Sequence, residues 1–218
     1  MIKIENFDVF GWESAIRGMR NPMNSWDKSD SDSHPSLVGD IGHNDLKLMQ
    51  SLVKAGSDHS KFMRMINVTL DITAPLYWWK EFDTYKVGTV RNSCSTMHKI
   101  HSKEFTLDDF SHEHLISDGI DILTKIIEAL NDCRLFYLNY DEKIKSEYVT
   151  DEIRCKKDLW WQMIQLLPSS YNQRATVQLN YAVLRNMYHS RKNHKLDEWV
   201  EFCKWVETLP YANVLITN

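Results

Sequence analysis

The segment TYKVGTVRNSCST, residues 84–96, gathers side chains suited to holding a polar ligand. Lys86 and Arg91 carry positive charge, Thr89 offers a hydroxyl group and Cys94 offers a thiol. Such side chains add little to a hydrophobic core, but they are good donors to a phosphate or to a hydrogen-bonding ring. The segment is therefore either a solvated loop or the wall of a binding site, and the residues by themselves leave both open.

Cys94 is also a candidate nucleophile, because positive charge from Lys86 and Arg91 would stabilise its thiolate. A nucleophile needs a positioned base as well, and the sequence identifies none. We therefore expect Cys94 to be a small passive residue.

Four histidines follow the polar segment, and imidazole is the commonest transition-metal ligand in proteins. They are His98, His101, His112 and His114. Neither an HExxH motif nor a Cys/His pairing accompanies them. We expect no metal site.

A second set of polar side chains lies in residues 177–191. If a helix begins near Val177, Asn180 and Arg191 fall close to one face, and Asn186 lies about 120° around it from Asn180. Amides and a guanidinium on one face can bind a flat ring and a phosphate. The same pattern is typical of a solvated helix face, so both interpretations stay open.

The hydrophobic periodicity predicts the elements that position these residues. Residues 66–73 alternate as a strand with one buried face, and residues 46–55 and 76–85 have helical spacing. Further helices are predicted within residues 112–140, 156–168, 178–193 and 196–210, whereas residues 21–45 are typical of a long surface loop. We expect one helix-rich α+β domain over residues 1–218, with a small, mainly antiparallel sheet.

Composition excludes several classes of protein. The 218 residues are 43% hydrophobic and 26% charged, which is typical of a folded domain, and the net charge of -4 disfavours binding to a nucleic acid polymer. No apolar run approaches the length that crosses a membrane, and the first residues do not resemble a signal peptide. The four cysteines are far apart, so we expect reduced thiols and a cytoplasmic protein.

Three blocks of the sequence resemble the flavin-dependent thymidylate synthase family, also called thymidylate synthase complementing proteins. LMQSLVKAGSDHSKFMR is similar to the family's helix and the His-x-(Ser/Thr)-Pro-Phe-Glu-His turn after it. NVTLDITAPLYWWKEFDTYKV is similar to its strand, Ala-Pro and helix, and LLPSSYNQRATVQLNYAVLRNMYHSRKNHKLDEWVEF to its Leu-Pro, Asn and Leu-Arg region. The blocks cover most of residues 46–205, so the resemblance implies that family's fold.

The family signature RHRxxSxNxxSxR falls on residues 84–96 when Ala74 and Pro75 are used as the anchor. This chain departs from it at Thr84, Tyr85, Lys86, Thr89, Arg91, Cys94 and Thr96. Each lost guanidinium removes charge-assisted donors worth about 1.5 to 3 kcal/mol apiece. A further dUMP-binding arginine of the family falls on Ile164, which cannot bind phosphate.

The resemblance also implies a set of site residues. It places Lys86, Thr89, Arg91, Cys94 and Arg191 against the substrate nucleotide. It places Asp58 or His59, and also Glu81, Asn180, Asn186 and Lys195, against the cofactor. Ala182 and Lys195 stand where an arginine and a histidine are more usual, and Ser190 replaces the leucine before Arg191.

The implied activity is methylation of dUMP or a related uridine nucleotide. Such enzymes use FAD as cofactor and NADPH and methylenetetrahydrofolate as co-substrates, and they assemble as homotetramers. The chemistry belongs largely to the cofactor, so no catalytic side chain is assigned. Because the signature is degenerate, a catalytically lapsed relative that binds or sequesters a small nucleotide is the alternative, and a purely structural oligomer is a third possibility.

Overall fold

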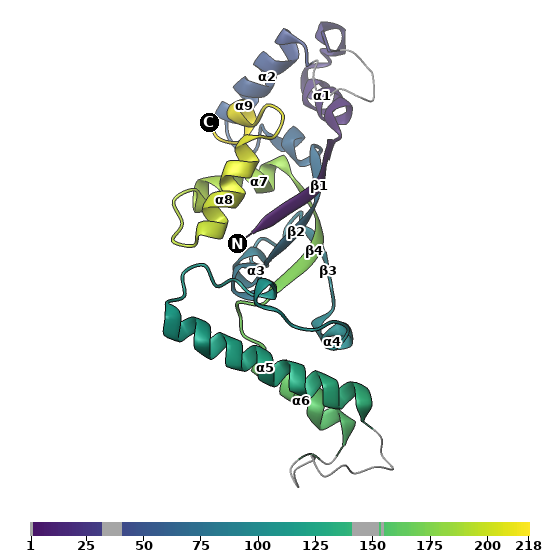
Figure 1. Cartoon of the computed structure of the whole chain (residues 1–218). Coiled ribbons are helices and arrows are strands. Elements are labelled where there is room, and N and C mark those ends of the chain that lie inside the picture. Colours follow the sequence, from purple (N-terminus) through teal and green to yellow (C-terminus); the bar gives the residue numbers. More distant parts are fainter. Residues whose placement is uncertain (1, 32–40, 141–152, 154) are drawn as a thin grey trace. The chain divides into compact units, whose positions relative to one another are not determined.

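The computed structural model describes residues 2–31, 41–140, 153 and 155–218 (Figure 1). These residues divide into two compact units. The first unit contains Ala74–Tyr77 and Ser93–Arg174, and the second contains Ile2–Thr73, Trp78–Asn92 and Ala175–Asn218. The long loop expected at residues 21–45 lies partly outside the described residues, and its described part includes the short 3₁₀ helices η1 (Asn21–Met23) and η2 (Trp26–Lys28).

A four-stranded sheet has the strand order β1-β2-β4-β3. Its strands are β1 (Lys3–Phe10), β2 (Asn67–Pro75), β3 (Val90–Ser93) and β4 (Asn172–Asn180). β1 pairs antiparallel with β2, with Lys3 opposite Thr73 and Phe10 opposite Asn67. The strand predicted from the alternation of apolar residues is confirmed as β2, in which Val68, Leu70 and Ile72 are buried.

β4 corrects the expectation of a helix beginning near Val177. Ala175, Val177 and Leu179 are buried and alternate with exposed residues, which is the period of a strand with one buried face. The helix α7 (Tyr181–Arg191) begins only after this strand. Asn180 is its N-cap, with its Oδ1 atom accepting a hydrogen bond from the backbone N–H of Val183 at 3.1 Å.

The second unit contains most of the described helices. They are α1 (Trp12–Arg20), α2 (His43–Lys54), η3 (Lys61–Arg64), most of α3 (Leu76–Phe82), α7, α8 (Asp197–Glu207) and α9 (Ala212–Leu215). Aromatic side chains join α3 to α8, with the ring centroids of Trp78 and Trp199 4.8 Å apart. The predicted helices α2, α3 and α8 are confirmed, and so is the helix-rich α+β class with a small sheet.

The first unit is built on two helices that run side by side, α5 (Ser117–Asn139) and α6 (Lys156–Leu166) (Figure 1). Both were predicted, and α4 (Thr96–Lys99) and η4 (Leu107–Asp109) complete the unit. Leu130 and Met163 are fully buried at its core. Ile164 packs against this core, which gives a physical reason for an apolar side chain at that position. No described helix is both long and apolar enough to cross a membrane.

Candidate functional site

A pocket of about 370 Å³ lies in the second unit, beside the turn that follows α2, the short helix η3 and the helix α7. It is lined by Val53, Gly56, Ser57, Ser60, Met63, Arg64, Ala182, Arg185, Asn186 and His189. These lining residues include two arginines and a histidine but no carboxylate. The volume is typical of small-molecule sites, and the lining favours an anionic ligand.

Local sequence explains how η3 presents Arg64 to the pocket. Gly56 has a φ of +103°, a conformation that glycine adopts without strain, and it turns the chain out of α2. Phe62 and Met63 are then buried in the core. Arg64, the next residue, remains exposed and lines the pocket.

Helical spacing explains the contribution of α7. Arg185 and Asn186 follow Ala182 by three and four residues, and His189 follows them by four and three, so the four share one face of the helix. Arg185 is anchored on one side, because its Nη1 atom donates to the carbonyl oxygens of Leu215 at 3.1 Å and Ile216 at 3.0 Å. Burial lowers the pKa of Arg185 from its ordinary value.

Arg191, the last residue of α7, is held in a polar network. Its Nη1 atom donates to Glu81 Oε2 at 2.6 Å and its Nε atom donates to Tyr85 Oη at 2.9 Å. The guanidinium carbon lies 5.0 Å from the centre of the Trp199 ring. His194 Nδ1 accepts from the backbone N–H of Leu196, and its Nε2 lies 3.4 Å from Glu81 Oε2.

This network orients the guanidinium and uses only some of its N–H donors. A guanidinium has five N–H donors, and the two hydrogen bonds to Glu81 and Tyr85 leave three that have no partner among the described residues. Its plane is fixed by the carboxylate, the phenol and the indole, so the free edge is preorganised for a phosphate or a carbonyl. The structure thus brings together two residues of the predicted set, Arg191 and Glu81.

Arg91 lies in a different environment. Its Nη1 atom is 3.1 Å from Asp83 Oδ2, and its guanidinium carbon lies 4.5 Å from the centre of the Trp79 ring. The positive charge that replaces the signature asparagine is therefore balanced by a carboxylate and supported by an aromatic face.

Lys86 and Thr89 flank a tight turn before β3. Lys86 is exposed, whereas the Thr89 Oγ1 atom is buried with no hydrogen-bond partner in the described part of the chain. Gly88, between them, has a φ of +78°, and a Cβ atom there would lie 2.9 Å from Asn180 Nδ2. Glycine therefore lets this turn lie against the N-cap of α7.

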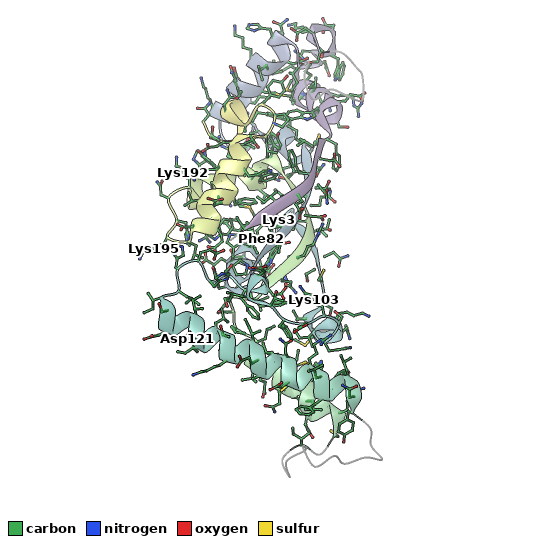
Figure 2. The ribbon with its side chains drawn as sticks, in the orientation of Figure 1. Lys3, Phe82, Lys103, Asp121, Lys192 and Lys195 are labelled. Carbon is green, nitrogen blue, oxygen red and sulfur yellow. The ribbon has the colours of Figure 1, made fainter. Side chains whose placement is uncertain are left out.

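The remaining predicted residues are more scattered. Asp58 and His59 are exposed on the turn whose neighbours Ser57 and Ser60 line the pocket, and Asn186 lines the pocket itself. Lys195 is exposed and projects outward after α7 (Figure 2). Cys94 belongs to the first unit, where its backbone N–H donates to the Arg174 carbonyl oxygen at 2.9 Å.

Within the described ranges, no group of three or more His, Cys, Asp or Glu side chains is placed to hold a metal ion. Of the four candidate histidines, His112 has its Nδ1 atom 2.8 Å from the Phe110 carbonyl oxygen, and the His101 ring lies 4.6 Å from the Tyr137 ring.

Sequence reasoning missed the cationic residues of the pocket, Arg64, Arg185 and His189. Arg185 and His189 could have been found, because they lie one residue before and three residues after Asn186 and so share its face of a helix. Arg64 lies on η3, a segment distant from α7 in sequence, and no periodicity connects the two.

Among comparisons with known proteins, only the one with solved structures identifies the fold. No protein-family model matches the chain, and no curated protein matches its sequence. Among solved structures, it is similar to the flavin-dependent thymidylate synthase ThyX from Helicobacter pylori complexed with FAD and dUMP, with a TM-score of 0.64 and 16% identity. That match covers 98% of this chain and 97% of that one.

A second similar structure is the UMP/dUMP methylase PolB from Streptomyces cacaoi bound with 5-Br UMP, with a TM-score of 0.59 and 13% identity. The match covers 100% of this chain and 92% of that one. The chain therefore has the fold of the flavin-dependent thymidylate synthases, as the three sequence blocks implied. Because fold does not fix activity, function has to be argued from the site.

Proposed function

We propose that this chain is a flavin-dependent thymidylate synthase-like enzyme that methylates dUMP or a related uridine nucleotide. FAD would be the cofactor, and NADPH and methylenetetrahydrofolate the co-substrates. We propose further that residues 1–218 act as one domain in a cytoplasmic homotetramer. The observation that carries the proposal is the pocket beside α7, which combines Arg64, Arg185 and His189 with the amide of Asn186 and has no carboxylate among its lining residues.

The lining of this pocket fits the diphosphate of FAD. A diphosphate needs several N–H donors in a place without competing negative charge, and Arg64 and Arg185 supply them. Ser57, Ser60 and Asn186 add neutral donors for the flanking sugar or ring groups. When bound, the flavin would supply the chemistry, taking electrons from NADPH and passing the one-carbon unit to C5 of the uracil ring.

The nucleotide would be held by groups near the other end of α7 and on the signature segment. Arg191 offers the free edge of an oriented guanidinium, Lys86 offers an exposed cation and Thr89 offers a buried hydroxyl group without a partner among the described residues. Fixing the phosphate and the ring is most of what a protein must do when the cofactor carries the reaction.

A second candidate function is that of a lapsed relative that binds or sequesters a nucleotide without turnover. The pairing of Arg91 with Asp83 and of Arg191 with Glu81 favours this reading. Arg191 of the proposed nucleotide site and Arg91 of the signature segment are already balanced by carboxylates, so less charge remains to bind phosphate than the family signature implies.

Calorimetric titration of FAD into matched variants tests the pocket. Arg64→Ala removes an exposed cation that lines the pocket, and Lys61→Ala removes an exposed cation from the same short helix that does not line it. Loss of one charge-assisted hydrogen bond of about 1.5 to 3 kcal/mol weakens binding by about ten- to hundredfold. We expect that loss for Arg64→Ala and a nearly unchanged affinity for Lys61→Ala.

Titration of dUMP, followed by an assay for methylated product, separates the two candidates. Binding of dUMP and FAD with product formation supports the enzyme. Binding of dUMP without FAD and without product supports the lapsed relative. If neither ligand binds the wild-type protein, both functions are wrong.

A further inference from the structure

The turn between α7 and α8 holds His194 by hydrogen bonds to its backbone and to its ring. The backbone N–H of His194 donates to the carbonyl oxygen of Arg191 at 2.9 Å. The backbone N–H of Leu196, the N-cap residue of α8, donates to the Nδ1 atom of the ring at 3.1 Å. The ring is therefore fixed relative to the end of α7, where Arg191 lies.

These contacts decide which nitrogen of the ring faces Glu81. A ring nitrogen that accepts a hydrogen bond carries no proton, so the single proton of the neutral His194 ring is on Nε2. The Nε2 atom lies 3.4 Å from Oε2 of Glu81. His194 thus presents an N–H group, and not a lone pair, to the carboxylate.

The same oxygen of Glu81 also faces Arg191, whose Nη1 atom donates to it at 2.6 Å. A carboxylate and a guanidinium often join through two parallel hydrogen bonds, but between these two residues the structure has one. Because the Nε atom of Arg191 donates to Tyr85, a second bond to Glu81 would have to come from Nη2. That bond would use donors that the present contacts leave for a ligand.

His194 opposes the change to a two-bond pair. Trp199 is fully buried, and its ring centre lies 6.4 Å from that of His194 and 5.0 Å from the guanidinium carbon of Arg191. The carboxylate of Glu81, on a side chain that is 34% exposed, is the part of the network with most freedom to turn. Turning it toward Nη2 would give up the contact of Oε2 with the N–H group of His194.

We propose that His194 is a positioning residue of the nucleotide site. Through Glu81 it keeps the pair with Arg191 at one hydrogen bond, so that the rest of the guanidinium stays open to the ligand. Its effect on nucleotide binding rests on the proposed function, whereas its arrangement with Glu81 is a property of the protein without ligand.

Nitrogen chemical shifts of the His194 ring test that arrangement in the protein without ligand. For the neutral ring we expect a proton on Nε2 and none on Nδ1, with the signals assigned by their loss in His194→Asn. A proton on Nδ1 would overturn the proposal.

Titration of dUMP into two conservative variants separates a positioning role from a merely structural one. In His194→Asn the amide oxygen takes the place of Nδ1 and can still accept from Leu196, but no group reaches Glu81. In His194→Gln the amide N–H takes the place of Nε2 and can still reach Glu81, but the acceptor for Leu196 is lost. We expect His194→Asn to lower the affinity for dUMP about tenfold at a nearly unchanged unfolding temperature. We expect His194→Gln to keep the affinity and to unfold at a lower temperature.

His43→Asn is the matched control, because His43 is exposed at the start of α2 and does not line the pocket. Neither the affinity for dUMP nor the unfolding temperature should change in this variant. Wild-type affinity in His194→Asn, or an equal loss of affinity in His194→Gln, overturns the positioning role and leaves the proposed function standing. A wild-type protein that binds no dUMP overturns both.

A double-variant cycle tests whether His194 acts through Glu81. In a Glu81→Ala background the carboxylate is absent, so adding His194→Asn should cause no further fall in the affinity for dUMP. A further fall of about tenfold would show that His194 acts on the ligand by another route, and would contradict the proposal.

Discussion

Replacing Arg191 by lysine keeps its charge but removes the geometry that the structure gives it. In the wild-type protein, one edge of the guanidinium is fixed by Glu81 and Tyr85, and three N–H donors remain for a ligand. A lysine ammonium has three donors in all, on a flexible stem, and the pair with Glu81 occupies at least one of them. Arg191→Lys is therefore expected to weaken nucleotide binding.

The size of this effect follows from the donors lost. One charge-assisted hydrogen bond contributes about 1.5 to 3 kcal/mol, so the affinity for dUMP is expected to fall by about ten- to hundredfold. The free energy of unfolding should fall by no more than about 1.5 to 3 kcal/mol, since one hydrogen bond from the guanidinium, to the Tyr85 hydroxyl, is lost within the chain. The Arg191 side chain is 20% exposed, which also limits the fall in the free energy of unfolding.

Isothermal titration calorimetry with dUMP, in the presence and absence of FAD, measures this prediction. Arg17→Lys is the matched control, because Arg17 is 63% exposed on α1 and only 3.8 Å from an exposed glutamate, Glu13. A surface pair of that kind contributes about 0 to 1 kcal/mol, so neither stability nor dUMP affinity should change measurably. A folded Arg191→Lys protein with wild-type dUMP affinity would refute the role given to the guanidinium.

Three further variants test the scaffold around the site. Asp45→Asn is expected to lower the free energy of unfolding by about 3 to 5 kcal/mol in urea titrations, because Arg20, 4% exposed, loses its buried partner. Burial raises the pKa of Asp45, but hydrogen bonds from two serines and from Arg20 outweigh burial, so the pKa is lowered. The stability that the ionised carboxylate contributes is therefore complete above the ordinary pKa of about 3.9 and is lost as the pH falls through the lowered pKa. Asp45→Asn should lack this acid dependence. Gly88→Ala puts a Cβ atom against Asn180 on a backbone with left-handed φ, and it is expected to lower the free energy of unfolding by about 1 to 2 kcal/mol in thermal unfolding. An unchanged unfolding temperature would contradict the tight turn. Thr89→Val removes a buried hydroxyl group that has no partner among the described residues. The free energy of unfolding should therefore stay the same or rise by about 1 to 2 kcal/mol, while the affinity for dUMP falls. A large fall in the free energy of unfolding would show that the hydroxyl is bonded within the chain.

Strong periodicity made much of the fold predictable. β2 alternates without a break, and α5 keeps its apolar pattern over its whole length. β1 was not predicted, because its register with β2 shifts between Glu5 and Asp8, where Asn6 has a φ of +50°. The irregularity interrupts the alternation on which a strand prediction depends. The helix α1 was also not predicted, although its sequence has helical spacing, with Trp12, Ile16 and Met19 three or four residues apart.

The site was less predictable, because its main contacts join distant parts of the chain. Arg191 and Glu81 are separated by 110 residues, and no local pattern indicates that they form an ion pair. The family resemblance assigned Arg191 to the substrate nucleotide and Glu81 to the cofactor, so it did not indicate that the two residues contact each other. The pairing of Arg91 with Asp83 and Trp79 likewise depends on how the segment before β3 folds back, which residue types alone do not specify.

The absorbance spectrum of the purified protein, recorded before and after addition of FAD, NADPH and then dUMP, tests the proposed function most directly. We expect a flavin spectrum that NADPH bleaches weakly alone and more fully once dUMP is present. Protein that stays colourless and takes up no added FAD would contradict it.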